Sequence, residues 1–394
     1  MSKVVCPYCF KEFERRDVKF RCGNVSRCKR TDDAVLHAYW KITQITGVAI
    51  TPKKGFFRFG GTPDSAVCPE CGEKSYQMIC PHCHNRIPKE MVKKKGYIIS
   101  IIGARSSGKT NYITTLINEL MRHGSDLGDI GIIASNVADN PEYTTQLRYE
   151  RDFFDVLYRR KTCPPQTDIN DPKSRIPLIY EINQKNCRPL YLVFYDTAGE
   201  NFGNLRNIAG NVEFLNRSDA VIWLLDTFAV PYIHDKLGIK EPIELRFDTI
   251  MANIMAHFTD NVSEEVSRNH FDKPMALVFS KIDAILGNAE LFDDTSVAAL
   301  RMEVNSSFME TGRVSLSEFD SISDSLAEAL KAWQEPNFVK NILNKYRNYK
   351  YFGVSALGGQ PDRSNRVEKV RPYRVLDPLV WILSEFKYKL PIDK

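Results

Sequence analysis

Short apolar runs of strand length recur through the last three quarters of this chain. They lie at 97–102, 177–182, 191–195, 220–225, 276–279 and 351–354. Between them apolar residues return at helical spacing, as in the face formed by Tyr112, Leu116 and Leu120. Alternation of strands and helices is typical of a mostly parallel sheet, and uninterrupted apolar strands are buried on both sides. The pattern therefore predicts an α/β fold with helices on both faces of the sheet.

Two further segments, 143–160 and 375–390, also have helical spacing of apolar residues. In the second, a single apolar stripe predicts a helix that closes the fold by packing on the sheet, in preference to a helix that binds a membrane. No apolar run approaches the ~20 residues that cross a bilayer, and residues 1–6 contain no apolar signal core. We therefore expect a cytoplasmic protein.

The composition is that of an ordinary soluble protein, with 43% hydrophobic and 26% charged residues in 394. Its net charge of +5 is unevenly distributed. Residues 1–95 hold 19 Lys and Arg against 9 Asp and Glu, so the rest of the chain carries a net charge of −5. Together with the position of the cysteines, this shift predicts a small module over 1–92 and a larger domain over 93–394.

Eight of the ten cysteines lie before residue 84, in closely spaced pairs. Such clusters favour metal binding over disulfides in a reducing compartment. Two thiolates at a tight turn can hold one side of a tetrahedral zinc ion, and a second pair completes the site. The spacing predicts a zinc-ribbon module with two sites, the first made by Cys6, Cys9, Cys22 and Cys28 and the second by Cys68, Cys71, Cys80 and Cys83.

This grouping has an alternative, in which Cys6 and Cys9 share a metal with the pair Cys68 and Cys71. The sequence does not choose between the two. His82 and His84 flank the last cysteine of the module. Because four cysteines already complete a site, we expect both histidines to be solvated. Cys163 and Cys187 have no partner at metal spacing and are assigned no function.

Basic and aromatic residues interleave between the two cysteine groups, at 53–59. This composition is compatible with nucleic-acid binding through phosphate contacts and base stacking. It is equally typical of a small metal-stapled module whose aromatic residues form the core while the charges stay solvated.

The strongest motif follows the first apolar strand directly and opens a helical segment. It consists of Gly103, Ala104, Arg105, Ser106, Ser107, Gly108, Lys109 and Thr110. Glycines let backbone N–H groups wrap around a phosphate, Lys109 reaches the terminal phosphates, and the Thr110 hydroxyl can bind Mg²⁺. Since strand, loop and helix occur in the order that the motif requires, the sequence predicts a nucleotide site.

Three later apolar strands also end in polar motifs. These are Asp196-Thr-Ala-Gly199 after 191–195, Ser280-Lys281-Ile-Asp283 after 276–279, and Ser355-Ala356-Leu357 after 351–354. In order and spacing, the four motifs resemble those of P-loop GTPases of the translation-factor-related class. A cysteine-rich front before a GTPase domain with insertions is also similar to the bacterial double-GTPase families.

The resemblance implies a role for each motif. Asp196 would hold Mg²⁺ through water, and the N–H of Gly199 would sense the terminal phosphate. Asp283 would accept the N1–H and N2 amino hydrogens of guanine, which adenine lacks, while Lys281 would lie along the base. The loop behind the guanine carbonyl would be Ser355, Ala356 and Leu357. The implied cofactors are GTP or GDP with Mg²⁺, in addition to zinc.

Several positions decide how closely this chain follows the family. Ser280 replaces an Asn or Thr, although its hydroxyl can still bond to the phosphate loop, and Leu357 replaces a residue that is often polar. Glu200 stands where Ras-like members use Gln to orient water. Its carboxylate could polarise that water or repel the γ-phosphate, so we expect slow hydrolysis without a partner. Thr167 is the expected switch threonine that ligates Mg²⁺, and Thr162 is the alternative.

These features predict a switch that binds and hydrolyses GTP, with Lys109, Thr167 and Glu200 as catalytic residues. The zinc module would recognise a protein partner, and the double-GTPase resemblance implies a setting in bacterial conflict or defence. Two other classes stay open. One is an ATP-driven NTPase, and the other is a non-catalytic scaffold in which the bound nucleotide is structural.

Overall fold

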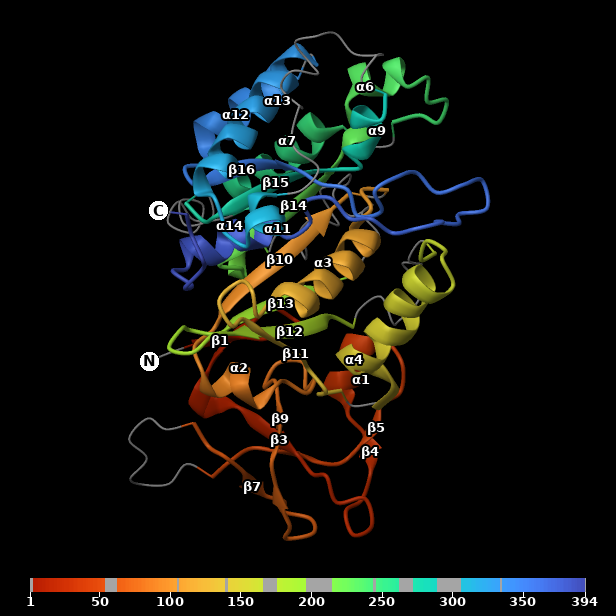
Figure 1. Cartoon of the computed structure of the whole chain (residues 1–394). Coiled ribbons are helices and arrows are strands. Elements are labelled where there is room, and N and C mark those ends of the chain that lie inside the picture. Colours follow the sequence, from red (N-terminus) through yellow and green to blue (C-terminus); the bar gives the residue numbers. More distant parts are fainter. Residues whose placement is uncertain are drawn as a thin grey trace.

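The computed structural model describes residues 3–53, 62–104, 106–138, 141–165, 176–195, 215–243, 246–261, 272–288, 306–333 and 335–393. Its centre is a seven-stranded sheet with the order β11-β12-β13-β10-β14-β15-β16 (Figure 1). The strands are β10 (Tyr97–Gly103), β11 (Gly131–Ala134), β12 (Leu178–Asn183), β13 (Leu190–Phe194), β14 (Ala220–Asp226), β15 (Met275–Ser280) and β16 (Tyr349–Gly353).

The sheet is mostly parallel, as the apolar pattern predicted. Strands β13, β10, β14, β15 and β16 run in the same direction, whereas β12 is antiparallel to β13 and β11 is antiparallel to β12. The chain leaves β10 toward one edge and later returns to β14 on its other side. Ligands in such sheets bind beyond the carboxyl ends of the strands at this reversal, which is where the phosphate-loop motif lies.

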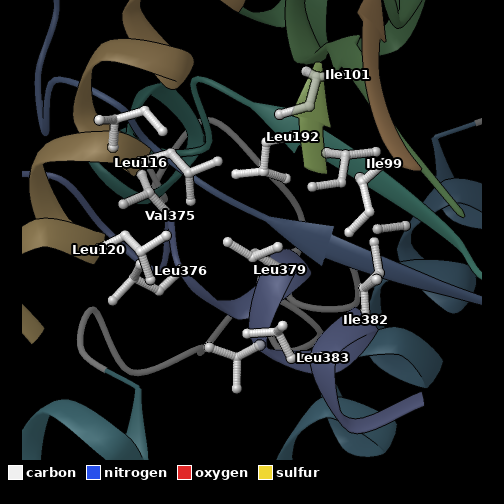
Figure 2. Close-up of a cluster of buried hydrophobic side chains, with 14 of the residues drawn as sticks. Ile99, Ile101, Leu116, Leu120, Leu192, Val375, Leu376, Leu379, Ile382 and Leu383 are labelled. Atoms are coloured by element: carbon white, nitrogen blue, oxygen red, sulfur yellow. The ribbon is translucent and has the colours of Figure 1, made fainter. Parts of the chain in front are cut away.

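One face of the sheet is covered by α3 (Lys109–His123) and α14 (Asp377–Glu385). Alternate residues of β10 and β13, such as Ile99, Ile101 and Leu192, point into this layer (Figure 2). Leu116 and Leu120 of α3 meet them together with the α14 side chains Leu379, Ile382 and Leu383. The prediction that 375–390 forms a closing helix packed on the sheet is therefore confirmed.

The opposite face has two different coverings. Over β14 and β15 lie α7 (Phe247–Asn261), α12 (Leu316–Ala332) and α13 (Pro336–Lys345), with α6 (Pro231–Lys236) beside them. Over β12 and β13 the covering layer is the cysteine-rich module instead, whose core includes Ile98, Ile179, Tyr191 and Val193 of the sheet. The module and the larger domain thus share one apolar core.

The described part of the larger domain contains further helical segments. They are α4 (Thr145–Arg148), the π-helix η3 (Tyr149–Arg159), the 3-10 turns η2 (Pro141–Tyr143) and η6 (Thr227–Ala229), α9 (Asp283–Leu286) and α11 (Ser307–Thr311). The helix expected over 143–160 corresponds to α4 and η3, which follow one another without a break.

The cysteine-rich module consists of short strands and two small helices at one end of the molecule (Figure 1). Its strands are β1 (Lys3–Val5), β2 (Glu12–Glu14), β3 (Lys19–Arg21), β4 (Thr31–Asp32), β5 (Ile45–Thr46), β6 (Ala49–Ile50), β7 (Ala66–Val67), β8 (Lys74–Ser75) and β9 (Gln77–Ile79). Its helical segments are the 3-10 turn η1 (Arg15–Asp17), α1 (Ala34–Trp40) and α2 (Lys89–Lys93). Within the described ranges, no helix has the length and hydropathy to cross a bilayer.

Candidate functional site

The phosphate-loop motif connects the carboxyl end of β10 to the first turn of α3. Ser106 has φ 64° and Gly108 has φ 73°, so the chain takes left-handed steps that turn successive N–H groups inward. A Cβ atom at Gly103 would lie 2.4 Å from the Ser107 hydroxyl oxygen, so a side chain there would displace that hydroxyl. That buried hydroxyl has no hydrogen-bond partner among the described residues. These features fit an anion held by the loop.

Lys109 and Thr110 are the first two residues of α3, and Lys109 is buried. The N–H groups of a first helical turn have no partner within the helix and attract negative charge. The structure therefore places both side chains at the positive end of a 15-residue helix. Arg105 lies outside the described residues.

The Ser280-Lys281-Ile-Asp283 motif lies at the carboxyl end of β15. Lys281 has φ 59°, and this left-handed step ends the strand so that α9 can begin at Asp283. The Ile282 N–H donates to the Val354 carbonyl at 3.2 Å, which ties this motif to the end of β16. Two motifs separated by about 70 residues in the sequence thus lie side by side.

Ser280 has hydrogen-bond partners at the end of β14 that were not expected. Its hydroxyl donates to the Leu225 carbonyl at 3.1 Å, and the Thr227 hydroxyl donates to the Ser280 carbonyl. These bonds join β15 to β14. The expected bond between the Ser280 hydroxyl and the phosphate loop stays a prediction, since the hydroxyl oxygen can still accept a hydrogen bond.

Lys281 has two partners that the sequence analysis missed. Its ammonium lies 2.9 Å from a carboxylate oxygen of Asp226 and 4.7 Å from the ring centroid of Phe228. Asp226 also accepts a hydrogen bond from the Phe228 N–H at 3.1 Å, so this carboxylate fixes both groups. The signal was present in the sequence, because Asp226 ends the apolar run 220–225 just as the polar motifs end the other strands.

The Ser355-Ala356-Leu357 loop follows β16. Ser355 is buried, and it exchanges backbone hydrogen bonds with Tyr373 at 3.1 and 2.7 Å. Its hydroxyl accepts from the Gly358 N–H at 2.8 Å. The loop is therefore held at its start, while Ala356 and Leu357 remain only partly buried.

A cavity of about 320 Å³ lies between these motifs. This volume is within the range of small-molecule sites. Its walls include Gly108 and Asn111 from the start of α3, Ser280, Lys281, Asp283, Phe228, Cys163, and the loop from Val354 to Asn365. The oxygen of the Asn111 amide is buried there without a hydrogen-bond partner among the described residues.

One wall of this cavity is made by two segments about 200 residues apart. The Cys163 N–H donates to the Asn365 carbonyl, and the Val367 N–H donates to the Lys161 carbonyl, both at 2.9 Å. Cys163, to which the sequence analysis assigned no function, thereby lines the cavity. Burial raises the pKa of its thiol, while a hydrogen bond with Asn111 acts in the opposite direction.

Of the two candidates for the switch threonine, the structure describes only Thr162. The Thr162 hydroxyl lies 3.4 Å from the Val156 carbonyl, near the end of η3. The other expected switch and catalytic residues lie outside the described ranges, namely Thr167, Asp196, Gly199 and Glu200. Phe56, Phe57 and Phe59 of the basic and aromatic segment lie outside them as well.

The eight cysteines of the module form two compact groups of four. Site 1 contains Cys6, Cys9, Cys80 and Cys83, and site 2 contains Cys22, Cys28, Cys68 and Cys71. Sulfur atoms from different pairs lie 3.7 and 3.8 Å apart in site 1 and 3.6 and 3.7 Å apart in site 2. A zinc–sulfur bond of about 2.3 Å in a tetrahedral site places sulfur atoms about 3.8 Å apart. Both groups therefore fit zinc.

This grouping corrects the sequence analysis. Each site combines one pair from the first 30 residues with one pair from 68–83, so neither expected set of four exists, and Cys6 with Cys9 does not join Cys68 and Cys71 either. The reason is the antiparallel pairing of β3 with β9, which brings the two cysteine-bearing segments together. Such a long-range contact leaves no signature in the local spacing.

The two histidines near site 1 differ from each other. His82 is exposed, as expected, whereas His84 is buried and its Nδ1 lies 2.9 Å from the Asp33 carboxylate. The expectation of a solvated His84 is wrong. Arg21 is buried beside the same carboxylate at 3.4 Å. Asp33 therefore joins three segments of the module while it also caps α1.

Comparison with known proteins agrees with these motifs. The family model described as Double-GTPase 2 matches residues 97–334, which is more than half of the chain. A curated protein of Mycolicibacterium smegmatis, named "Putative ESX-1 scaffolding and assembly protein SaeC", is 25% identical over 411 residues and covers 98% of this chain and 99% of its own.

Solved structures are matched as well, at low TM-scores. The GTPase-like domain of Ski7 from S. cerevisiae, bound to GTP, is 10% identical over 75% of this chain and 51% of its own, with a TM-score of 0.32. The signal recognition particle receptor SRb-GTP/SRX complex from Chaetomium thermophilum is 13% identical over 68% of this chain and 94% of its own, with a TM-score of 0.27. Because these TM-scores are low, the family of this chain is assigned from the family model alone.

Proposed function

Because this chain belongs to the Double-GTPase 2 family, we propose that it is a GTP-dependent switch that hydrolyses its nucleotide slowly. The observation that carries the proposal is the shared cavity. It joins Gly108 at the phosphate loop to Asp283 and Ser355 at the carboxyl ends of two other strands. The residues proposed to bind the phosphates and the base therefore line one cavity, whose volume lies within the range of small-molecule sites.

The described residues suggest how the parts divide the work. The phosphate loop and Lys109 would hold the phosphates and stabilise the charge that develops on them during in-line attack by water. Asp283 would select guanine by accepting two hydrogen bonds that adenine cannot donate. Mg²⁺, held through Thr110 and Asp196, would neutralise charge on the β- and γ-phosphates. Thr167 and Glu200 remain the proposed switch and water-orienting residues.

The stem of Lys281 has a fixed place in this arrangement. With its ammonium held by Asp226 and lying against Phe228, the lysine cannot swing freely across the cavity. We propose that the Asp226 carboxylate keeps the side chain of Lys281 extended along the base. A preorganised side chain costs less entropy when the ligand binds.

The cysteine-rich module, residues 1–92, would serve as the arm that recognises a partner of the switch domain, residues 93–394. Likeness to SaeC extends over nearly the whole of both chains, the module included. The description of SaeC as a scaffolding and assembly protein supports protein partners and a part in assembling a protein complex. The comparisons give no support to nucleic acid as the partner, or to a role in conflict or defence.

Nucleotide selectivity tests the proposal directly. We expect the full-length protein to bind GTP more tightly than ATP, and Asp283→Asn to weaken GTP binding by about 10- to 100-fold, since hydrogen bonds to a charged group are worth roughly 1.5–3 kcal/mol. ATP binding should not change. Asp362→Asn is the matched control, because Asp362 also lines the cavity but its carboxylate accepts from Ser364 and Arg366 in its own turn. Equal affinity of the wild-type protein for GTP and ATP would refute guanine selectivity.

The nucleotide that is released from the purified protein separates a switch from a scaffold. A slow hydrolase should release mostly GDP, and single-turnover hydrolysis should change in Glu200→Gln. A structural nucleotide would be released as intact GTP, and Lys109→Ala would then unfold the domain rather than abolish a rate.

A further inference from the structure

The cysteine-rich module covers β12 and β13 on the face of the sheet where helices cover β14 and β15. Along β13, Leu190, Leu192 and Phe194 point to the α3 and α14 layer, whereas Tyr191 and Val193 point into the core of the module. Both of the latter are almost completely buried. The module therefore packs on the larger domain at this strand, and it is not an independent domain joined only by a linker.

The module also contacts the carboxyl end of β13. Tyr195, the next residue after the strand, donates its hydroxyl to the carbonyls of Pro7 and Tyr8. These two residues lie between Cys6 and Cys9, so their carbonyls belong to the turn that carries two ligands of site 1. The Tyr195 ring also packs edge-on against Phe10, with centroids 5.3 Å apart.

A second contact comes from the same hairpin of the module. Glu12, at the start of β2, forms an ion pair of 3.0 Å with Arg217. In the sequence, Tyr195 immediately precedes Asp196, and Arg217 lies shortly before β14. The hairpin of β1 and β2 therefore holds the chain on both sides of the segment that contains Asp196 and Gly199.

Metal binding at site 1 would fix the turn of this hairpin. Small metal modules gain folding free energy from the metal, so an ion held by Cys6 and Cys9 would stabilise the positions of the Pro7 and Tyr8 carbonyls between them. Any change at the end of β13 that accompanies nucleotide exchange must then work against the Tyr195 hydrogen bonds. When two sites influence one element in this way, each changes the affinity of the other by the same factor.

We propose that site 1 and its Cys6–Cys9 turn position the end of β13 through Tyr195, so that nucleotide binding and the module are thermodynamically coupled. Tyr195 is a positioning residue in this scheme and touches no nucleotide itself. The inference rests on the proposed function, because it needs a chain that binds both GDP and GTP.

The test compares the affinities of the zinc-loaded, full-length protein for GDP and for a non-hydrolysable GTP analogue. Tyr195→Phe keeps the ring against Phe10 and removes only the hydroxyl. We expect it to change the ratio of the two affinities by about fivefold or more, the lower range of measured coupling between sites. Tyr39→Phe is the matched control, because the Tyr39 hydroxyl donates to the same Tyr8 carbonyl at 3.2 Å but belongs to the module itself. Its ratio should stay within about twofold of wild type.

A second pair of variants tests the same proposal if Tyr195→Phe fails to fold. Glu12→Gln removes the ion pair to Arg217, together with the exposed pair between Glu12 and Lys3 inside the hairpin, and should shift the ratio in the same direction as Tyr195→Phe. Glu14→Gln is its control, because Glu14 pairs with Arg16 inside the module. Hydrogen exchange of residues 3–14 supplies a readout independent of binding, and its rates should differ between the GDP and GTP-analogue states of the wild type.

The outcomes separate the two proposals. If both nucleotides bind and neither Tyr195→Phe nor Glu12→Gln changes the affinity ratio, the coupling is refuted while the switch function stands. If the wild-type protein binds neither nucleotide, the proposed function fails, and the coupling fails with it.

Discussion

The grouping of the cysteines makes a quantitative prediction about zinc retention. Structural zinc sites bind with about 10–16 kcal/mol, so each of four thiolates contributes roughly 3 kcal/mol and its loss weakens binding by about 100-fold. Two losses from one site weaken it by about 10,000-fold and leave the other site intact. Two losses spread over both sites weaken each of them by about 100-fold.

Two double variants therefore distinguish the possible groupings. Cys9→Ser with Cys80→Ser removes two ligands from site 1, whereas Cys9→Ser with Cys22→Ser removes one ligand from each site. After dialysis against a chelator that strips a site with three thiolates but not one with four, the first variant should retain one zinc ion per chain and the second none. Zinc is measured by elemental analysis of the full-length protein.

Each alternative grouping gives a different result. If the four cysteines before residue 30 formed one site, the two variants would exchange their outcomes. If Cys6 and Cys9 shared a metal with Cys68 and Cys71, neither variant would retain tightly bound zinc. Either result would refute the spatial grouping described above, since the number of changed cysteines is the same in both variants.

Two further predictions concern stability. Leu379 is completely buried in the core of Figure 2, so Leu379→Ala should lower the free energy of unfolding by about 3 kcal/mol in urea titrations, whereas Met121→Ala, at a position that is 52% exposed, should change it by less than about 0.5 kcal/mol. Burial lowers the pKa of Lys273 to about 8, although Asp219 opposes the shift. In the unfolded chain the lysine has its ordinary pKa near 10.5, so between pH 8 and pH 10.5 the unfolded chain binds more protons than the folded one. The free energy of unfolding of the wild type, relative to that of Lys273→Met, should therefore rise over this pH range by at most about 3 kcal/mol. If the stability of the wild type and that of Lys273→Met changed equally with pH, this prediction would be wrong.

Much of the larger domain could be predicted from the sequence because its strands are buried on both sides. The run at 97–102 corresponds to β10 and the run at 220–225 to β14, each within one residue at either end. By contrast, β11 was not predicted. It is a short edge strand of half-exposed residues, so it lacks the continuous apolar run that marked the others.

The candidate site was predictable to the extent that its residues follow strands. The carboxyl ends of parallel strands meet at one edge, so polar motifs after separate strands converge, as Lys281 and Ser355 do at the cavity. The wall made by Cys163 and Asn365 was not predictable. It depends on backbone hydrogen bonds between two loops far apart in the sequence, and neither loop has a periodic pattern from which this contact could be predicted.

The interleaved cysteine pairs set an order of events during synthesis. Each metal site needs one cysteine pair from before residue 30 and one from 68–83. A nascent chain that ends before residue 68 therefore carries four thiols without a complete site. Neither site can close until the second pairs have left the ribosome, and the module can dock only after β13, about 110 residues later, has been made. Early in translation, the front of this protein is therefore exposed to oxidation and to binding of the wrong metal. Cells that are short of zinc should consequently lose newly made chains before they lose mature ones.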